Sequence, residues 1–593
     1  MSVTPMMAQY LEIKSKHPGA MLFYRMGDFY ELFFDDAVAA AEALDIALTK
    51  RGKHQDKDIP MCGVPVHAAE GYLLTLIRKG FRVAVCEQLE SPAEAKKRGS
   101  KSVVKRDVVR LVTPGTLTEE ALLEARSNNY LAAFAQVRDD DALAWVDIST
   151  GAFHVMPLSG LRLGPELARL APSELVVAET AENDLRPLVT EFGIALTGLA
   201  RSAFDSASGE TRLCDLFGVE TLDAYGSFNR AEVAAMGAVI QYIDITQKGK
   251  LPLLRPPQRE TAARTVQIDA ATRRNLELTQ ALSGGRNGSL LAVLDRTVTP
   301  GGARLLGHRL ASPSRDLETV TDRLDAIDFM MDNDLRKNMR DLLRKVPDLD
   351  RALSRLSLER AGPRDMAAIR NGLIQAADLH ALLDTWDLPD LMRKAVDDLK
   401  DHDALIDLLD AALVADPPLL ARDGGFIAPD HDSDLDEARE LRDKGRGVLA
   451  ALQQEFVSLT GISSLKIKHN NVLGYFIETT ATHADKMLSP PLSETFIHRQ
   501  TTANQVRFTT VELSELETKI LNAGARALEI EKRLFETLRQ AILDTAGEIA
   551  QTASALSELD HVTALAELAI NENWTRPKVD DSRAFDIREG RHP

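Results

Sequence analysis

Apolar and polar residues alternate in short runs over the first 113 residues, a pattern typical of mixed α/β structure. A helix is predicted from Pro5, which suits a first helical turn, and it ends before His17-Pro18. Two apolar runs, Met21–Met26 and Phe29–Phe34, flank the turn residues Gly27-Asp28 and predict a hairpin. Further expected elements are a helix over 35–47 and strands over 81–86 and 103–112.

The pattern changes along the rest of the chain. Residues 128–252 alternate strand-like segments (142–148, 175–178) with helix-like ones, which predicts a second α/β domain. From about residue 253 the spacing becomes helical, for example over 268–282 and 317–332. The strongest helical pattern is 513–545, where apolar residues recur every seven positions and predict a long helix packed on 435–459. Its stripe comprises Leu521, Leu528, Phe535 and Ile542, beside Ile520, Ala527, Leu534 and Ala541.

Residues 461–510 have a different composition. They contain β-type runs (464–467, 472–479 and 496–510) rich in Thr, Arg, Asn and Gln. We expect a small strand-rich insert at the tip of two long antiparallel helices. The chain ends in strand-and-loop sequence at Pro593 without a helix cap, which suggests an interrupted polypeptide.

Length and composition indicate a soluble multidomain protein. With 593 residues, 44% of them apolar and 27% charged, about four domains are expected. No apolar run reaches the roughly 18 residues of a membrane span, and no secretion signal is recognisable. The three cysteines, Cys62, Cys86 and Cys214, form no C-x-x-C pair, which favours a reduced cytoplasmic protein without a zinc site.

The charge is unevenly distributed. The net charge of -18 disfavours a general polycation, but residues 1–113 carry 17 Lys and Arg against 14 Asp and Glu. Residues 461–510 carry five against three, with three histidines. Two segments with a net positive charge in an otherwise acidic chain indicate localised anion binding. The run Lys96–Arg110, with seven basic residues, is either a solvated face or a contact to phosphates.

The aromatic residues cluster in one short segment. Six of the chain's 30 aromatics lie within 23–34. In a strand, Phe29 and Glu31 share one face and Tyr30 takes the other. Either Phe29 belongs to the core and Glu31 is solvated, or Phe29 is an exposed wedge beside an acid. A ring can enter a base step more cheaply where pairing is already disturbed, and a carboxylate can accept a base N–H there.

Several motifs, in this order, resemble the MutS family of DNA mismatch-repair proteins, and the resemblance spans essentially the whole chain. The motifs are Met26-Gly-Asp-Phe-Tyr-Glu-Leu-Phe33, Pro60-Met-Cys-Gly-Val-Pro65, Val112-Thr-Pro-Gly-Thr116, Asp269–Glu277, Asp423-Gly-Gly425, Gly474-Tyr475, Arg499-Gln-Thr501 and Gly590-Arg-His-Pro593. The resemblance implies a mixed α/β mismatch-binding domain (1–113), an RNase H-like connector (128–252), core and lever helices (253–455 and 512–580), a β-rich clamp (456–511) and the start of an ATPase domain (581–593).

The resemblance also implies site residues and partners. Phe29 should stack on the mispaired base and Glu31 should hydrogen-bond it, with Met26 and Arg51 flanking the DNA. Double-stranded DNA with mismatches or small loops is the implied ligand, with a homodimer and a MutL-type factor as partners of the full-length protein, in the cytoplasm of a bacterial-type cell near the nucleoid. The expected backbone contacts in the clamp are Lys466, Lys468, Asn470, Arg499, Asn504 and Arg507.

Two departures from the family pattern matter. His498 and Ala503 stand where basic residues are common, so clamp affinity is expected to be weaker or pH-sensitive. No G-x-x-x-x-G-K-[ST] loop occurs: Gly249-Lys250 lacks the upstream glycine, and the glycine-rich segment 284–288 is expected to connect helices. ATP and magnesium are therefore expected to act only in the full-length family member, and this chain is expected to have no ATPase activity, cofactor or metal of its own.

Two alternatives from other classes remain open. Asp147 on a predicted strand, with Glu174 and Glu179, would be the carboxylates of a metal-dependent RNase H-like nuclease. A non-catalytic helical scaffold is the other, and it predicts no preference for mismatched over perfect duplex.

Overall fold

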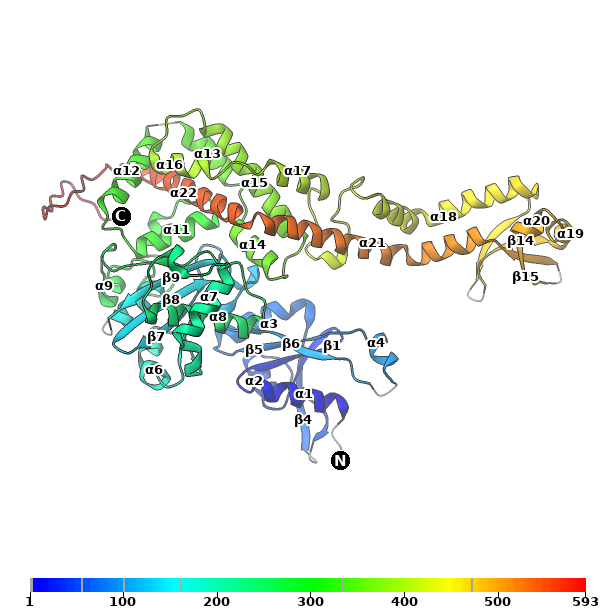
Figure 1. Cartoon of the computed structure of the whole chain (residues 1–593), viewed down its shortest axis with the longest axis horizontal. Coiled ribbons are helices and arrows are strands. Elements are labelled where there is room, and N and C mark those ends of the chain that lie inside the picture. The colour runs from blue at the N-terminus through cyan, green and yellow to red at the C-terminus, as the bar shows by residue number, and fades with distance from the viewer. Residues whose placement is uncertain are drawn as a thin grey trace. The chain divides into compact units, whose positions relative to one another are not determined.

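The computed structural model describes residues 4–54, 57–99, 102–159, 162–332, 334–470, 473–502 and 504–593, and the chain divides into two compact units (Figure 1). The first unit comprises residues 1–361, 371–402 and 545–593, and the second comprises 362–370 and 403–544. The architecture is multidomain and mixed α/β, as the sequence predicts. Among the residues that the structure describes, none of the helices combines the length and hydropathy needed to span a bilayer.

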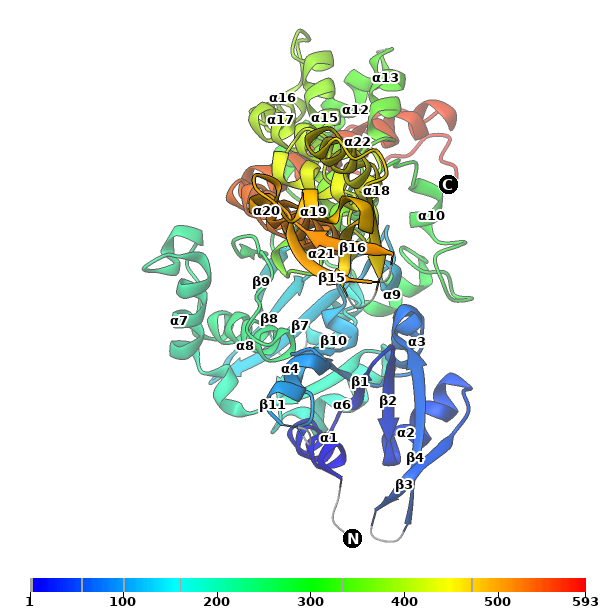
Figure 2. The same cartoon turned by 90° about the vertical axis from the view of Figure 1, so that its right-hand side faces the viewer.

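The N-terminal part is a six-stranded sheet of order β3-β4-β2-β1-β5-β6 with helices on both faces. Neighbouring strands are antiparallel except β1 and β5, which are parallel. Alternation sends Tyr24 to the face covered by α1 and Phe23 to the face covered by α2 and α3. β3 and β4 form a ribbon at the lower right of Figure 2. The elements are α1 (Pro5–Lys16), β1 (Met21–Met26), β2 (Phe29–Phe33), α2 (Phe34–Leu44), β3 (Thr49–His54), β4 (Lys57–Pro65), α3 (Ala69–Arg78), β5 (Val83–Gln88), α4 (Pro92–Lys97) and β6 (Arg106–Val112).

A second six-stranded sheet, of order β11-β10-β7-β8-β9-β12, follows. Helices α7 and α8 cover one face, and α5 and α6 cover the other. α7 and α8 touch backbone to backbone, because a Cβ on Gly237 would lie 2.5 Å from the Cα of Gly209. The elements are β7 (Tyr130–Val137), β8 (Asp140–Asp147), β9 (Ala152–Leu158), α5 (Leu163–Leu170), β10 (Glu174–Ala178), α6 (Glu182–Glu191), β11 (Ala195–Leu199), α7 (Ser206–Phe217), α8 (Arg230–Gln247) and β12 (Gln258–Arg259).

The helical part of the first unit is built around α22 (Ala546–Asn571), which packs against α11, α12, α13, α14 and α16. Thr299 is the N-cap of α11, and the buried Asp560 of α22 holds it: the carboxylate accepts from the Thr299 amide at 2.7 Å and from the Thr299 hydroxyl at 2.6 Å. Gly302 lets the helices approach this closely, because a Cβ there would lie 2.3 Å from Asp560 Oδ2. The other helices are α9 (Ala270–Asn275), α10 (Leu290–Leu294), α11 (Pro300–Ala311), α12 (Leu317–Met331), α13 (Leu335–Leu343), α14 (Leu349–Ser357), α16 (Asp390–Asp397) and α15 (Pro363–Leu383), of which residues 363–370 belong to the second unit.

The helix expected over 268–282 is wrong for most of its length. Helix α9 ends at Asn275, because Glu277 adopts a left-handed backbone conformation with a φ of 48°. The Glu277 carbonyl then accepts the Leu290 amide at 2.8 Å, which closes a loop over the glycine-rich segment. Helical spacing alone did not reveal this turn.

The second unit is a pair of long helices, α18 (Ser433–Thr460) and α21 (Val511–Asp544), with a four-stranded sheet between them in sequence. The expected apolar stripe is partly wrong, since Leu521 is 69% exposed and the buried seam of α21 runs through Ala523, Ala527, Ile530, Leu538 and Ile542. The sheet is antiparallel, of order β13-β14-β16-β15. Its elements, with the preceding helix, are α17 (Asp403–Ala412), β13 (Lys466–Asn470), β14 (Gly474–Thr480), α19 (Ala484–Met487), α20 (Leu492–Thr495), β15 (Ile497–Thr501) and β16 (Gln505–Thr509).

Candidate nucleic-acid interface

Strand β2 holds an aromatic ring in solvent at its first residue. Phe29 is 48% exposed, whereas Tyr30 is buried and packs against Phe23. Phe33 lies on the same face as Phe29 four residues later, but it is buried under Tyr10 of α1, with ring centroids 4.9 Å apart. Alternation therefore places Phe29 on the sheet face that α1 covers, but Phe29 itself is not covered.

Glu31 shares this face and is paired with Arg51. Arg51 Nη1 donates to Glu31 Oε2, and the side chains are 43% and 15% exposed, respectively. Arg51 lies on β3, with β4 between it and Glu31. Gly63 of β4 stands opposite Glu31 and carries no side chain; a Cβ there would lie 3.8 Å from Glu31 Cγ and 3.9 Å from Phe29 Cδ1. Gly63 thus leaves a path across β4 to the carboxylate.

Met26 completes the patch from strand β1. It stands opposite Phe29 in the register of β1 and β2. Arg106 Nη2 donates to Met26 Sδ at 3.4 Å, and Arg106 Nε donates to the Arg25 carbonyl at 2.7 Å. The structure therefore brings Met26, Phe29, Glu31 and Arg51 together, and we call these four residues the Phe29 patch.

The basic run Lys96–Arg110 is only partly available to a ligand. Arg98 pairs with Glu90, and Arg110 pairs with Glu119. Arg106 is held against β1 as described above. Lys96, Lys97 and Lys105 are exposed, and Lys101 lies outside the described residues.

The four-stranded sheet presents cations around one carboxylate. Glu478 on β14 is 5% exposed and accepts from Lys468 Nζ at 2.6 Å and from Arg507 Nε at 3.2 Å. Partial burial raises the pKa of Glu478, but the two cations lower it further, so the carboxyl pKa lies below its usual range. The Arg507 guanidinium lies over the Phe476 ring, 4.7 Å from its centroid. Glu478 therefore fixes two of the expected backbone contacts.

The other expected clamp residues lie on or beside this sheet. Lys466 and Asn470 share the strand and the face of Lys468, since they alternate along β13. Arg499 is exposed at a β-bulge in β15, and Asn504 is exposed just before β16. We call Lys466, Lys468, Asn470, Arg499 and Arg507 the cationic face.

The two departures from the family pattern fall in this region. His498 Nε2 lies 2.8 Å from the Thr501 hydroxyl, and its ring meets the Phe508 ring edge-on. Ala503 lies outside the described residues.

Sequence reasoning missed the roles of Gly63 and Glu478, and it took Arg106 only as a member of the basic run, whereas the structure holds Arg106 against β1. Their signals were present in part, because alternation in 474–480 puts Glu478 on the face of Phe476. The partners of Glu478 lie 10 and 29 residues away, so its role depended on strand register. Gly63 belongs to the motif Pro60–Pro65, but the motif by itself does not give this glycine a role.

The nuclease alternative is not supported. Asp147 is buried, and its carboxylate accepts from the Asn129 amide at 3.0 Å and the Ser149 hydroxyl at 2.6 Å. Glu174 is also buried and accepts from three hydroxyls, while Glu179 is exposed. Within the described ranges, no group of three or more His, Cys, Asp or Glu residues is arranged to hold a metal ion.

The described glycine-rich segments do not fit a triphosphate. The 284–288 segment precedes α10, a helix of five residues, and Arg286 is paired with Asp295. Lys250 is paired with Glu359. A phosphate-binding loop needs a free lysine at the start of a longer helix, and neither segment offers one.

Three family models match successive parts of the chain. Residues 4–121 match MutS domain I, 129–255 match MutS domain II and 271–566 match MutS domain III. The chain is 77% identical to the DNA mismatch repair protein MutS of Roseobacter denitrificans, over all of this chain and 68% of that protein. It is 70% identical to the protein of the same name from Ruegeria pomeroyi and 68% identical to that from Cereibacter sphaeroides, over all of this chain and 68% and 67% of those proteins.

Proposed function

The chain belongs to the MutS family of DNA mismatch-repair proteins, and on that premise we propose how its residues recognise mispaired DNA. Its function is DNA mismatch recognition in mismatch repair. The observation that carries the residue assignment is the exposed ring of Phe29 on a face that is otherwise covered.

Phe29 acts as the wedge in this proposal. Inserting a ring at a base step costs a few kcal/mol of stacking, and the cost is lower where the bases are mispaired. Burying a ring that already stands in water offsets part of that cost. Discrimination therefore comes from the DNA's own local instability and not from a base sequence.

Glu31 and Arg51 act together beside the wedge. Glu31 accepts a base N–H that is left without a partner by the mispair, and Arg51 turns from the carboxylate to a backbone phosphate. In the absence of DNA, Arg51 balances the charge of Glu31. On binding, the one contact between them is replaced by two charged contacts, from a base N–H to Glu31 and from Arg51 to a phosphate. Met26 borders the wedge from β1.

The cationic face supplies affinity without discrimination. Its Lys and Arg side chains contact phosphates, which are the same in perfect and mismatched duplex.

In the wider architecture, the second sheet with its helices is the RNase H-like connector, α18 and α21 are the levers, and the four-stranded sheet is the clamp.

The remaining assignments concern the full-length protein. ATP and magnesium act in the full-length family member, and this chain by itself does not hydrolyse ATP. The full-length protein acts as a homodimer with a MutL-type factor, in the cytoplasm at the nucleoid. An ATPase assay of this chain beside the full-length protein tests the first point, and hydrolysis by this chain would refute it.

Fluorescence anisotropy at fixed salt tests the wedge. The unchanged chain should bind a G·T heteroduplex more tightly than the matched homoduplex, and Phe29→Ala should remove that difference. Phe585→Ala is the matched control, because this ring is 88% exposed elsewhere in the chain, and it should leave the difference intact. If Phe29→Ala keeps the preference, the wedge assignment is wrong.

A further inference from the structure

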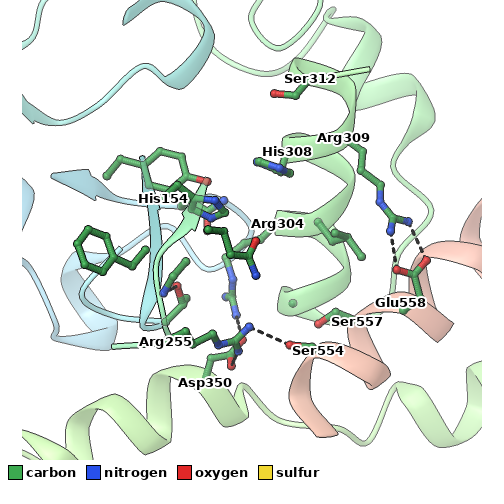
Figure 3. A pocket seen from close by; sticks show the side chains of 18 of the residues that line it. His154, Arg255, Arg304, His308, Arg309, Ser312, Asp350, Ser554, Ser557 and Glu558 are labelled. Carbon is green, nitrogen blue, oxygen red and sulfur yellow. Dashed lines mark hydrogen bonds and ion pairs between the residues drawn. The ribbon is translucent and has the colours of Figure 1, made fainter. Parts of the chain in front are cut away.

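A cavity of about 380 Å³ lies within the first unit, between strand β9 and helices α11, α14 and α22 (Figure 3). His154 projects from the strand, and Arg304 and His308 face it from α11. The volume lies in the range of about 300–1,000 Å³ typical of small-molecule sites. None of the Phe29 patch or cationic-face residues lines it.

Most charges in the lining are internally paired. Arg255 donates to Asp350 at 2.6 Å, and Arg304 lies 3.6 Å from the same carboxylate while bonding Asp348 at 2.6 Å. On the opposite side, Arg309 is paired with Glu558 at 2.5 Å. These pairs occupy the two carboxylates of the lining.

Arg323 is different, because within the described residues it has neither an ion pair nor a hydrogen-bond partner. It reaches the cavity from α12 and is partly buried, and burial beside Arg309 lowers the pKa of its guanidinium to about 10. A buried cation normally has a counter-charge. Glu558 also attracts Arg323, but it is already paired with Arg309, so this one carboxylate serves two guanidinium groups and the described lining keeps an excess positive charge.

Other donors face the same space. Arg255 lines the cavity with a side chain that is 32% exposed, while its Nε is buried and has no hydrogen-bond partner among the described residues. His154 and His308 stack with ring centroids 5.8 Å apart, and burial lowers the pKa of His154 to about 3, so both imidazoles are neutral and each carries one N–H. The nearest acid, Glu260, lies 3.5 Å from His154 Nδ1 and is paired with Arg169 at 3.0 Å. Guanidinium and imidazole groups therefore line a cavity whose two carboxylates, Asp350 and Glu558, are already paired.

We propose that this cavity binds a small phosphorylated molecule, with Arg323 and Arg255 donating to its phosphate oxygens beside His154 and His308. The donors come from a strand, a loop and two helices, so they approach from several directions. A tetrahedral phosphate with three acceptor oxygens suits such an arrangement, whereas a planar carboxylate suits one guanidinium fork. The cavity has room for more than a single phosphate.

Such a ligand would join two parts of the first unit. It would contact the second sheet through His154 and the helices around α22 through Arg323 and His308. Ligand binding would therefore stabilise the contact between the sheet and the helices, a regulation that is separate from mismatch recognition.

Calorimetric titration of the full chain tests the proposal with pyrophosphate, inorganic phosphate and acetate at constant ionic strength. We expect one pyrophosphate per chain, weaker binding of inorganic phosphate and weakest binding of acetate. Arg323→Gln should weaken pyrophosphate binding about tenfold or more, the loss expected for a charged hydrogen bond. The matched control is Arg274→Gln, an exposed arginine outside the cavity, and it should bind like the unchanged chain.

A second variant guards against a folding defect. His308→Gln should also weaken pyrophosphate binding, and thermal melts without ligand establish that each variant is folded. The proposal is overturned if pyrophosphate does not bind, if acetate binds as tightly, or if folded Arg323→Gln binds unchanged. Loss of binding in Lys468→Gln instead would place the anion on the cationic face and would also overturn it.

Discussion

Replacing Glu478 by glutamine tests how the cationic face binds DNA. The change keeps the shape of the side chain and removes the carboxylate that Lys468 and Arg507 share. Charged hydrogen bonds contribute about 1.5–3 kcal/mol each when buried. Lys468 is half exposed, so solvent screens its share, and the glutamine oxygen still accepts from one cation. We expect the sheet to lose about 1–2 kcal/mol of stability.

DNA binding should change in the opposite direction. Without Glu478 the face carries one more net positive charge, and the cation that the glutamine no longer holds becomes free for a phosphate. The slope of log affinity against log salt should steepen by about 0.9, which is about a 3.5-fold larger loss of affinity between 50 and 200 mM salt. Affinity at low salt should rise equally for homoduplex and heteroduplex, because phosphates carry no mismatch information.

Anisotropy titrations over a salt series measure this slope. Glu494→Gln is the matched control, since it removes an exposed carboxylate from the same segment that, within the described residues, has no ion pair with the cationic face, and its slope should change less. An unchanged or shallower slope in Glu478→Gln would refute the reasoning. It would mean that Glu478 holds the cations where DNA needs them.

Three further predictions concern recognition and stability. Glu31→Gln should raise affinity for homoduplex, because a negative charge beside phosphates is removed, and should reduce the preference for a G·T mismatch in the same titration. Gly302→Ala should lower the free energy of unfolding by about 1–3 kcal/mol, because its methyl group meets Asp560, and Gly307→Ala, with its nearest neighbour 3.8 Å away, is the control in urea unfolding. Burial and neighbouring cations lower the pKa of His154 to about 3 in the folded chain, against about 6.5 in the unfolded chain, so folding keeps this imidazole neutral. The free energy of unfolding is therefore unaffected by His154 above pH 6.5 and falls as the pH drops toward 3, because the unfolded chain binds the proton more tightly. The melting temperature should drop between pH 7.5 and 5.5, and a His154→Gln variant with the same pH slope would contradict this.

Local patterns predicted much of the fold. Alternation in β2 put Phe29 and Tyr30 on opposite faces but left open whether Phe29 is exposed, and the seven-residue spacing located α21 to within two residues. Both patterns depend on neighbours along the chain. Leu521 is exposed although Ile542, on the same seven-residue spacing, is buried, because spacing in one helix does not reveal where its partner lies.

The long-range contacts could not be predicted from the sequence. The pairing of Glu31 with Arg51 spans 20 residues and depends on the missing side chain of Gly63. The lining of the cavity runs from residue 128 to residue 558, so no window of sequence contains it. In both cases the chemistry follows from register and packing, which a single sequence does not encode in readable form.

The contact between Gly209 and Gly237 has an evolutionary consequence. Since the two backbones touch, neither position can accept even a methyl group unless one helix shifts away from the other. An alanine at one site should therefore be tolerated only together with compensating changes along α7 or α8. Among natural variants, these two positions should drift as a pair or stay fixed together.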